Sequence, residues 1–315
     1  MNLQQIDYIL ALDELRHFAA AAERCHVTQP TLSMMIKKLE EELNVVLFDR
    51  SSHPIKPTPA GETILEQARK VKLAADHLYT AAREINSGLS GELRLGIIPT
   101  LAPYLLPLFL HEFAQAHPQL LITIREMQTT SLMDALKKGS MDVGILATPL
   151  DDPYLEEHPL FREPFLAYVP PGDTSFGNDL ALTSLRNHTL WLLEEGHCFR
   201  TQVMRACSLR QSSTRRGNMH YEAGSIESLM RLVDRGEGVT IVPSLSTIGL
   251  SPARKKQLRT LAAPVPVRQI SMVSAPHFPR KKIMAALSSS ILTSLPQSHT
   301  EDNLTNGGKV IRLDV

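Results

Sequence analysis

The sequence contains few cysteines, few aromatic residues and no excess of charge of either sign. Among 315 residues there are three cysteines and one tryptophan, aromatic residues make up 5%, and Lys plus Arg balance Asp plus Glu at 33 each. Three cysteines are too few to staple a small secreted scaffold. A net charge of zero points to no class of charged partner. The function therefore has to be inferred from local motifs rather than from composition.

Long hydrophobic runs are also absent. No stretch of about eighteen apolar residues could form a membrane-spanning helix. Residues 1–5 have neither the basic start nor the apolar core of a signal peptide. An odd number of cysteines without an export signal fits the reducing cytoplasm, where a disulfide is usually transient or redox-sensing. We expect a cytoplasmic protein of two or three domains that does not contact a membrane.

Two of the three cysteines lie close together in the sequence. Cys198 and Cys207 are nine positions apart, and Gly196 before them predicts a loop that runs into a short helix. Nearby cations and a helix N-terminus favour the reactive thiolate form of a cysteine. The surrounding side chains are of mixed charge: His197, Arg200, Arg205 and Arg210 against Glu194 and Glu195.

The spacing of these cysteines has a geometric consequence. Nine residues of helix span about 13 Å, whereas a disulfide requires Cα atoms within about 7 Å of each other. A helical segment would have to unravel before Cys198 and Cys207 could bond, so the bond would act as a conformational switch. Two other interpretations remain open from the residues alone. Both thiols could be buried as small hydrophobic groups, or they could hold zinc, which the lack of paired ligand spacing disfavours. We expect no metal and no cofactor.

The first 60 residues predict a winged helix-turn-helix, a DNA-binding module. Apolar residues at helical spacing mark helices around residues 3–10, 18–25 and 29–43, with Cys25 on the apolar face of the second. Thr28 is a good N-cap and Pro30 suits the first turn of the third helix, and the proline-rich residues after position 50 would form the wing. The residues expected to face bases or phosphates are Thr28, Gln29, Pro30, Thr31, Ser33, Lys37, Lys38, Arg50 and Lys56.

Residues 61–90 predict a long helix followed by a linker. Apolar residues recur in steps of four and three, which is the 3.5-residue period of a coiled-coil seam. They are Ile64, Ala68, Val71, Ala75, Leu78, Ala82 and Ile85. We expect this helix to pair with the same helix of a second copy, in a homodimer or a homotetramer. The alternative is that its apolar face packs on its own domain.

From residue 91 onward, short apolar runs alternate with helical patterns. Strands are predicted over residues 93–98, 120–124, 143–146, 165–169, 190–193, 239–242 and 270–273, and helices over residues 101–116, 131–138, 199–206, 225–235 and 283–295. Such alternation is typical of an α/β domain with parallel strands. Ligands bind such folds at the carboxyl ends of the strands, where Thr100, Thr129 and the Cys198 loop stand.

We expect this α/β domain to cover residues 91–296 and to form two subdomains. The first would comprise residues 91–163 plus 267–296 and the second residues 164–266, with crossovers near Glu163-Pro164 and Val265-Pro266. The tail over residues 297–315, rich in polar residues and glycine, is expected to be poorly ordered.

The N-terminal motifs resemble those of LysR-type transcriptional regulators. Residues 17–61 contain, in order, His-Phe-x-x-Ala-Ala, Thr-Gln-Pro-Thr-Leu-Ser, Leu-Glu-x-Glu-Leu, Leu-Phe-x-Arg and Thr-x-Ala-Gly. The resemblance implies an α+β multidomain protein with an N-terminal winged helix-turn-helix and a long coiled-coil linker helix. It also implies a two-subdomain α/β regulatory domain of the periplasmic-binding-protein type.

The second half is similar to the OxyR-type hydrogen-peroxide sensors within that family. The matching motifs are Gly-Ile-Ile-Pro-Thr from residue 96, Pro-Tyr-Leu-Leu-Pro from residue 103, Gln-Thr at 128 and Glu-Gly-His-Cys-x-Arg from residue 195, with the same cysteine spacing. The resemblance runs from residue 1 to about residue 295. It implies that Cys198 reacts with peroxide and that Cys207 resolves the product. It also implies a peroxide pocket of Thr100, Thr129, His197, Arg200 and Arg268. The chain departs from the family at Met34-Met35, where polar groups are common.

The expected function is that of a transcription factor and not an enzyme. It would sense hydrogen peroxide through a reversible disulfide between Cys198 and Cys207 and regulate antioxidant genes. Its partners would be double-stranded DNA, a thioredoxin- or glutaredoxin-type reductant and RNA polymerase. A LysR-type regulator of a small metabolite is the alternative, favoured if Cys207→Ser leaves regulation intact. A thiol peroxidase is more remote, because it has no use for residues 1–60, and a solute-binding protein would require export.

Overall fold

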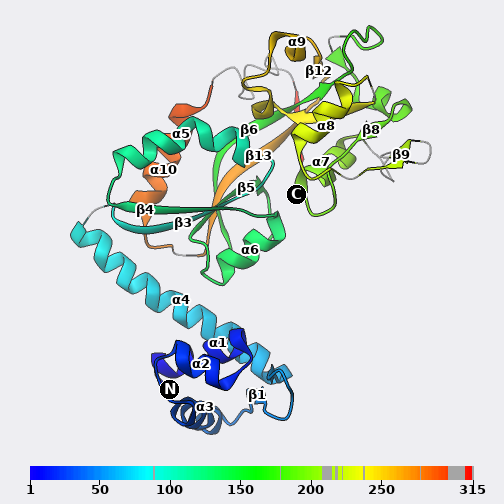
Figure 1. Cartoon of the computed structure of the whole chain (residues 1–315). Coiled ribbons are helices and arrows are strands. Elements are labelled where there is room, and N and C mark those ends of the chain that lie inside the picture. The colour runs from blue at the N-terminus through cyan, green and yellow to red at the C-terminus, as the bar shows by residue number, and fades with distance from the viewer. Residues whose placement is uncertain are drawn as a thin grey trace. The chain divides into compact units, whose positions relative to one another are not determined.

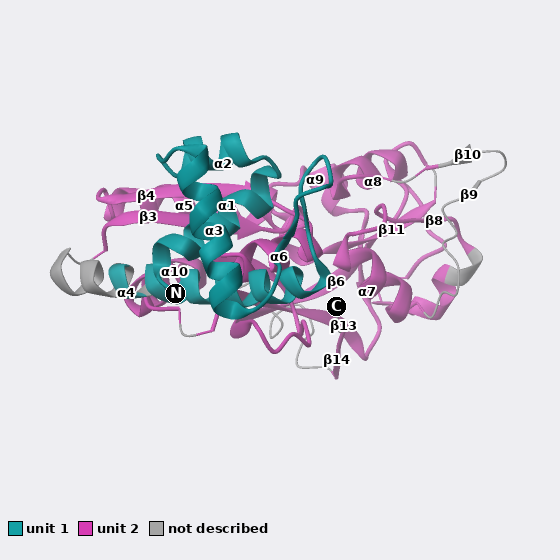
Figure 2. Cartoon of the chain, turned by 90° about the horizontal axis from the view of Figure 1, so that it is seen from below, with its two compact units in different colours: residues 1–86 teal, residues 87–315 magenta. Residues whose placement is uncertain are grey.

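The computed structural model describes residues 1–87, 89–177, 179–207, 215–216, 219–221, 223–236, 238–276, 278–296 and 309–313. The chain divides into two compact units, Met1–Asn86 and Ser87–Val315 (Figure 2). The first unit is built around one hydrophobic core and the second around two. No helix among the described residues is long and apolar enough to cross a membrane.

The first unit contains three short helices, a two-stranded sheet and one long helix (Figure 1). The elements are α1 (Leu3–Leu15), α2 (Phe18–Arg24), α3 (Gln29–Leu43), β1 (Phe48–Asp49), β2 (Lys56–Pro57) and α4 (Pro59–Ser87). β1 and β2 pair antiparallel and form the wing. The predicted winged helix-turn-helix is confirmed.

Side chains fix where the three short helices begin. Asn2 caps α1, His17 caps α2 and Thr28 caps α3, each by accepting a hydrogen bond from the backbone N–H three residues further on. Such caps satisfy donors that the first turn of a helix leaves free. Pro30 lies in the first turn of α3, as predicted.

The apolar faces of these helices form the core of the first unit. The buried residues include Ile6, Ile9, Leu12, Ala21, Leu32, Ile36, Leu39, Leu47 and Phe48. Cys25 is half-buried and packs against this core. The periodicity seen in the sequence therefore marks the correct faces.

The long helix α4 belongs in part to the same core. Leu65 and Ala68 are buried there, and Ile64 packs against it. Further along, Val71 and Leu78 are 41% and 72% exposed. The predicted seam therefore differs from the structure at Ile64 and Ala68, which face their own domain and not a partner. The side chains of residues 82 and 85 lie outside the described part.

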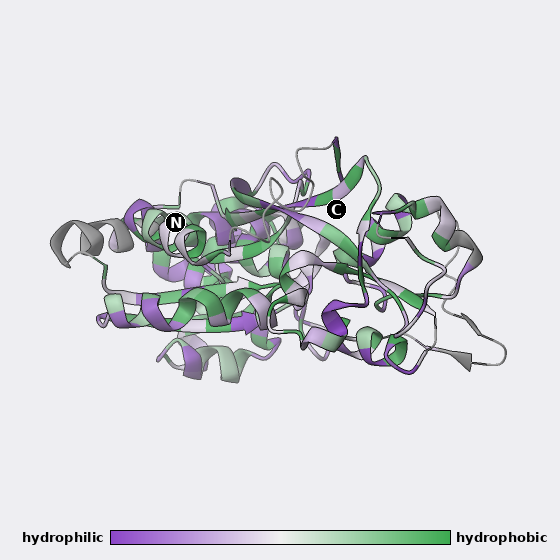
Figure 3. Ribbon diagram, turned by 90° about the horizontal axis from the view of Figure 1, so that it is seen from above, coloured by the Kyte–Doolittle hydropathy of each residue, from purple (hydrophilic) through white to green (hydrophobic). Residues whose placement is uncertain are grey.

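The second unit is organised around one large mixed sheet, with strand order β4-β3-β5-β13-β6-β11-β8. The bounds are β3 (Gly91–Ile97), β4 (Leu120–Glu126), β5 (Val143–Thr148), β6 (Glu156–Tyr168), β8 (Leu190–Trp191), β11 (Val239–Pro243) and β13 (Val265–Ser274). Short strands β7 (Asp179–Leu180), β12 (Leu258–Leu261) and β14 (Val310–Arg312) attach to it, and β9 (Arg215–Arg216) pairs separately with β10 (Met219–His220). Hydrophobic residues follow the central strands (Figure 3).

All five helices predicted for this unit are present within a few residues of their expected bounds. They are α5 (Ala102–Ala116), α6 (Thr129–Lys137), α7 (Cys198–Ala206), α8 (Ile226–Val233) and α10 (Lys281–Ser294). The structure adds α9 (Pro252–Lys255) and the 3-10 helices η1 (Leu182–Asn187) and η2 (Ser244–Thr247). These extra elements are too short for a periodic pattern to reveal them.

The sheet is only partly parallel, which differs from the prediction. β3 is parallel to β4 and to β5, and β8 is parallel to β11. However, β13 is antiparallel to β5 and to β6, and β6 is antiparallel to β11. β6 and β13 are long crossover strands of 13 and 10 residues that run side by side. Along β6, Phe161 belongs to one hydrophobic core and Phe165 to the other.

The C-terminal tail was expected to be poorly ordered, but part of it forms a strand. Residues 310–312 form β14, which pairs parallel with Val265, Pro266 and Val267 of β13. Leu313 is buried in the second of the two cores of this unit, and its carbonyl oxygen accepts a hydrogen bond from Gln202 Nε2 of α7 at 3.1 Å. A three-residue strand gains its stability from the strand beside it, which sequence reasoning cannot see. Residues 297–308 and 314–315 lie outside the described part.

We predict that Leu313→Ala destabilises the protein by about 2 kcal/mol, because a buried leucine leaves a cavity. The matched control is Ile311→Ala on the same strand, where the side chain is 46% exposed and the expected change is within about 0.5 kcal/mol. Urea unfolding midpoints of the two variants test this. Equal midpoints would show that the tail does not dock through Leu313.

Candidate functional site

The predicted site residues stand at the start of α7, just after β3 and β4, and on β13. Thr100 follows β3, Thr129 opens α6 directly after β4, and Cys198 opens α7. All seven predicted site residues are buried: Thr100, Thr129, His197, Cys198, Arg200, Cys207 and Arg268. Thr100 and Thr129 therefore stand just beyond the carboxyl ends of two neighbouring parallel strands.

A glycine brings two of these loops together. Gly196 has φ of +93°, and a Cβ placed on it would lie 2.6 Å from Gln128 Oε1. Only glycine allows this conformation and this approach without strain. The loop before Cys198 is therefore packed on Gln128, the residue that precedes Thr129. This contact supports a common pocket for the threonine and the thiol.

Cys198 occupies the first turn of α7, where negative charge is favoured. His197 is the N-cap residue but makes no side-chain capping bond, so the backbone N–H groups of the first turn are not satisfied by it. His197 Nε2 lies 3.6 Å from Glu194 Oε1. Arg200 Nη1 donates to Leu193 O at 2.6 Å and so anchors α7 to the segment that precedes it.

Arg268 forms the centre of a buried polar cluster. Its Nη1 donates to Thr100 Oγ1 at 3.0 Å and its Nη2 to Thr100 O at 3.3 Å. Nε and Nη2 lie 2.8 and 2.7 Å from Glu163 Oε2. The guanidinium carbon is 5.2 Å from the centroid of the Phe199 ring. Arg268 is thus held on one side by a carboxylate and on another by the residue next to Cys198.

Glu163 is a site residue that sequence reasoning missed. Both Glu163 and Arg268 side chains are 0% exposed, and they face each other across the β6–β13 pairing. The other oxygen of the carboxylate, Oε1, accepts a hydrogen bond from Leu245 N at 2.8 Å. The sequence showed Glu163 only as a crossover position. A carboxylate whose partner lies 105 residues away gives no local signal.

One buried hydroxyl is left without a partner. Thr129 Oγ1 has no hydrogen-bond partner among the described residues. A buried polar group without a partner is unfavourable by about 1–3 kcal/mol. Its position in the predicted pocket marks a place where a small polar ligand would be bound.

The two cysteines of α7 lie in different hydrophobic cores. Cys198 packs in the core formed by β3, β4, β5, α5, α6 and α10, and Cys207 packs in the core that contains Phe199, Val203 and Leu229. All three cysteines, which lie among the described residues, are thiols and not disulfides. α7 is helical from Cys198 to Ala206, with Cys207 as its C-cap. The thiols therefore stand at opposite ends of the helix, as the predicted geometry of the reduced form requires.

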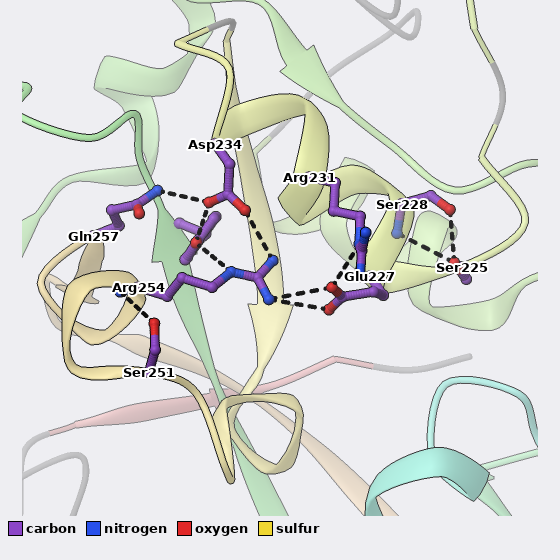
Figure 4. A network of polar contacts seen from close by, with 9 residues as sticks. Ser225, Glu227, Ser228, Arg231, Asp234, Ser251, Arg254 and Gln257 are labelled. Carbon is purple, nitrogen blue, oxygen red and sulfur yellow. Dashed lines mark hydrogen bonds and ion pairs between the residues drawn. The ribbon is translucent and has the colours of Figure 1, made fainter.

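A second polar network ties α8, α9 and β6 together without using any of the predicted site residues (Figure 4). Arg254 donates to Tyr168 Oη at 3.1 Å and to Glu227 Oε1 at 3.2 Å, and its Nη2 lies 3.1 Å from Asp234 Oδ2. Burial, together with the hydrogen bond to Asp234, raises the pKa of Tyr168 to about 12. The phenol therefore stays neutral and acts as a structural donor.

The predicted DNA-facing residues are mostly on the surface of the first unit. Thr28, Gln29, Pro30, Lys37, Lys38, Arg50 and Lys56 are exposed, and Thr31 and Ser33 are half-buried. Arg50 is oriented by Glu40 Oε2 at 2.8 Å and by Ser33 Oγ at 3.4 Å. The exposed Met34 on α3, which the sequence analysis did not count as a contact, stands beside them.

Among the residues the structure describes, no cluster of three or more His, Cys, Asp or Glu side chains could hold a metal ion.

Comparison with known proteins matches both units to one family. Residues 3–62 match the bacterial regulatory helix-turn-helix protein, lysR family, and residues 86–296 match the LysR substrate binding domain. The chain belongs to the LysR family of transcriptional regulators, and its matches place it among the OxyR-type members.

Individual relatives match over nearly the whole chain. The hydrogen peroxide-inducible genes activator of Dickeya chrysanthemi is 36% identical over 302 residues, covering 96% of this chain and 98% of that protein. The DNA-binding transcriptional dual regulator OxyR of Escherichia coli strain K12 is 36% identical over 296 residues, covering 92% and 95%.

Two solved structures are similar in fold. A cysteine-to-aspartate variant of full-length OxyR from Pseudomonas aeruginosa has a TM-score of 0.74 and 35% identity, covering 93% of this chain and 98% of that one. The hydrogen peroxide-bound form of a Corynebacterium glutamicum OxyR mutant has a TM-score of 0.58 and 31% identity, covering 93% and 94%.

We predict that Cys25 reacts slowly at neutral pH although it is the most exposed of the three thiols. Burial raises the pKa of Cys25, and the negative charge of Asp7 raises it further, whereas Arg24 has a smaller opposing effect on this pKa. Its thiolate fraction should therefore rise about tenfold per pH unit through the neutral range. In the Cys198→Ser/Cys207→Ser variant, the alkylation rate measured by mass spectrometry should be lower in the folded than in the urea-denatured protein at each pH. Equal rates in both states would contradict the prediction.

Proposed function

We propose that the chain is a transcription factor that senses hydrogen peroxide through reversible formation of a Cys198–Cys207 disulfide. The observation that carries the proposal is the placement of the two thiols at opposite ends of one helix and in separate cores. An oxidation that joins them cannot leave that helix intact. The relatives named for peroxide-inducible genes, and the peroxide-bound neighbour, support hydrogen peroxide as the oxidant.

The pocket supplies the groups that the first oxidation step needs. The Cys198 thiolate attacks one peroxide oxygen, the O–O bond breaks, the other oxygen leaves as hydroxide and a sulfenic acid remains. Thr100 and Thr129 hydroxyls can donate to and accept from the peroxide oxygens and so orient the bond for in-line attack. Thr129 Oγ1, which is buried and unpartnered among the described residues, would gain its hydrogen bond from the bound peroxide.

The second step turns chemistry into conformational change. The Cys207 thiol condenses with the sulfenic acid: the S–S bond forms, the S–O bond breaks, and the thiol proton leaves with the hydroxyl group as water. α7 would have to unravel because nine residues of helix keep the Cα atoms about 13 Å apart, against the roughly 7 Å that a disulfide allows. A thioredoxin- or glutaredoxin-type dithiol would return the protein to the reduced state.

The rearranged segment would act on DNA through the assembled protein. α4 carries exposed Val71, Leu78 and Tyr79, which form an apolar surface for the same helix of a second copy in a homodimer or homotetramer. In that assembly the α3 helices would read DNA, and a change of contacts between copies would respace them. The expected output is regulation of antioxidant genes in the cytoplasm, with RNA polymerase as a further partner.

Cysteine variants separate the two steps. Cys198→Ser should not respond to peroxide, because it lacks the attacking thiol. Cys207→Ser should consume one equivalent of peroxide and then stop at a trappable sulfenic acid before over-oxidation. Mass spectrometry of the wild-type protein after brief exposure to micromolar peroxide should show a single link between positions 198 and 207. A link between chains, or one that includes Cys25, would overturn the mechanism.

Replacement of Arg50 tests the DNA-binding surface. Arg50→Gln should weaken binding to all DNA sequences and reduce the salt dependence by about one unit of slope, as expected for one lost phosphate contact. Gln29→Ala should instead change which base pairs are preferred. Arg24→Gln is the matched control, because Arg24 is an exposed arginine on α2 that is also paired with a glutamate. The assignment fails if Arg50→Gln binds DNA like the Arg24 control.

A further inference from the structure

The buried Glu163–Arg268 pair has a geometry that stability alone does not explain. Both side chains are fully buried. Burial removes both charges from water, so such a pair contributes little net stability, and apolar replacements are often neutral or stabilising. The pair stands at the middle of the sheet, on β6 and β13, between the residues that belong to the two hydrophobic cores. The pair does fix which hydrogen bonds the neighbouring polar groups donate and which they accept.

Arg268 determines how the Thr100 hydroxyl is used. A guanidinium has only donors, so the 3.0 Å contact makes Thr100 Oγ1 the acceptor. The single hydroxyl proton of Thr100 must then point to another acceptor. Among the described residues no such acceptor is recorded for it. The carbonyl of Thr100 is also held by Arg268, so the whole residue is fixed at two oxygens.

Glu163 determines where Arg268 stands. Its Oε2 accepts hydrogen bonds from Nε and Nη2 of Arg268. Its Oε1 accepts one from the backbone N–H of Leu245 in η2. Both carboxylate oxygens are therefore committed and the group cannot rotate. The ring of Phe199 lies 5.2 Å from the guanidinium carbon. A continuous set of contacts thus runs from η2 through Glu163 and Arg268 to Thr100, alongside the start of α7.

We propose that Glu163 is a positioning residue for the oxidation of Cys198. Through Arg268 it holds the Thr100 hydroxyl as a donor aimed at the peroxide oxygen that leaves. This inference rests on the proposed function and adds to it the residue that sets proton direction in the pocket.

The step balances without another reactant. The Cys198 Sγ–O bond forms while the O–O bond breaks, so the sulfur loses two electrons and the peroxide gains them. The electron pair of the O–O bond moves to the leaving oxygen, which Thr100 stabilises by its hydrogen bond. That oxygen takes its second proton from the oxygen now bound to sulfur, and the products are the sulfenate and water.

Glu163→Gln tests the role because it keeps the shape and removes the charge. One of the two positions filled by a carboxylate oxygen becomes an NH₂ group that faces a donor, either Leu245 N–H or Arg268. Arg268 then loses its counter-charge, and the direction of the Thr100 hydroxyl is no longer imposed. The attacking thiol and Thr129 are unchanged. The loss of oxidation rate should therefore be larger for an oxidant whose leaving group is poor and needs a hydrogen bond from Thr100.

The experiment compares three reagents with full-length protein that also carries Cys207→Ser. Hydrogen peroxide releases hydroxide, peracetic acid releases acetate, a far better leaving group, and iodoacetamide reports thiolate reactivity alone. Glu163→Gln should slow sulfenic acid formation by hydrogen peroxide at least tenfold. Its rates with peracetic acid and iodoacetamide should stay within about twofold of the parent. Asp234→Asn, which removes a carboxylate paired with Arg254 in the second network, is the matched control and should leave all three rates unchanged.

Two further variants keep the test decisive if Glu163→Gln does not fold. Thr100→Val should show the same selective loss with hydrogen peroxide, whereas Thr100→Ser should retain the parent rate. Glu163→Asp, which keeps the charge but draws it back by one methylene, should give an intermediate rate with hydrogen peroxide only. Where Glu163→Gln folds, adding it to Thr100→Val should cause no further loss.

The outcomes separate the inference from the function on which it rests. A parallel fall with all three reagents, or an unchanged rate with hydrogen peroxide, would overturn the role of Glu163. The proposed function itself would be overturned if Cys198 reacted with hydrogen peroxide no faster than Cys25 in the parent protein, or no faster than Cys207 in the wild-type protein. A selective loss with hydrogen peroxide alone supports both.

Discussion

β6 and β13 pair side by side at the centre of the main sheet of the second unit, with β5, β3 and β4 beyond β13 and with β11 and β8 beyond β6. This pairing is antiparallel and spans both hydrophobic cores. It brings Arg268 opposite Glu163 although 105 residues separate them in sequence. Because sheet register fixes which side chains face each other, a slip of one residue would turn both charges away from each other. The position of Thr100 therefore depends on this one register.

α7 is anchored by contacts to several different parts of the second unit. Its first residue, Cys198, packs into one core, and the residues that follow pack into the other. Arg200 fastens the first turn to Leu193 O, and Gln202 reaches the tail strand through Leu313 O. These anchors lie on different neighbours, so they are lost together only when the helix as a whole is released. Cooperative release of this kind suits an element with two discrete arrangements.

Much of this architecture was accessible from the sequence. Capping residues such as Thr28 and apolar spacing such as Leu32, Ile36 and Leu39 encode local structure, and these predictions are confirmed. The pocket threonines were found through a resemblance, and the fold places them at strand ends. The antiparallel crossover, β14 and Glu163 were missed because each depends on a partner distant in sequence. Ile64 and Ala68 were misplaced because a heptad pattern reports an apolar stripe and not what covers it.

The division of the two thiols between separate cores links the packing of the protein to its electrochemistry. Burial of Cys198 and Cys207 stabilises the dithiol form, and any packing energy lost on oxidation makes the reduction potential of the pair less negative. About 1.4 kcal/mol of lost packing corresponds to roughly 30 mV for a two-electron couple. In the proposed disulfide cycle, hydrophobic residues of this core such as Val203 and Leu229 would therefore help to set how readily a dithiol reductant returns the protein to its reduced state. In that cycle the packing of the core would help to determine how much oxidant is needed to switch the protein.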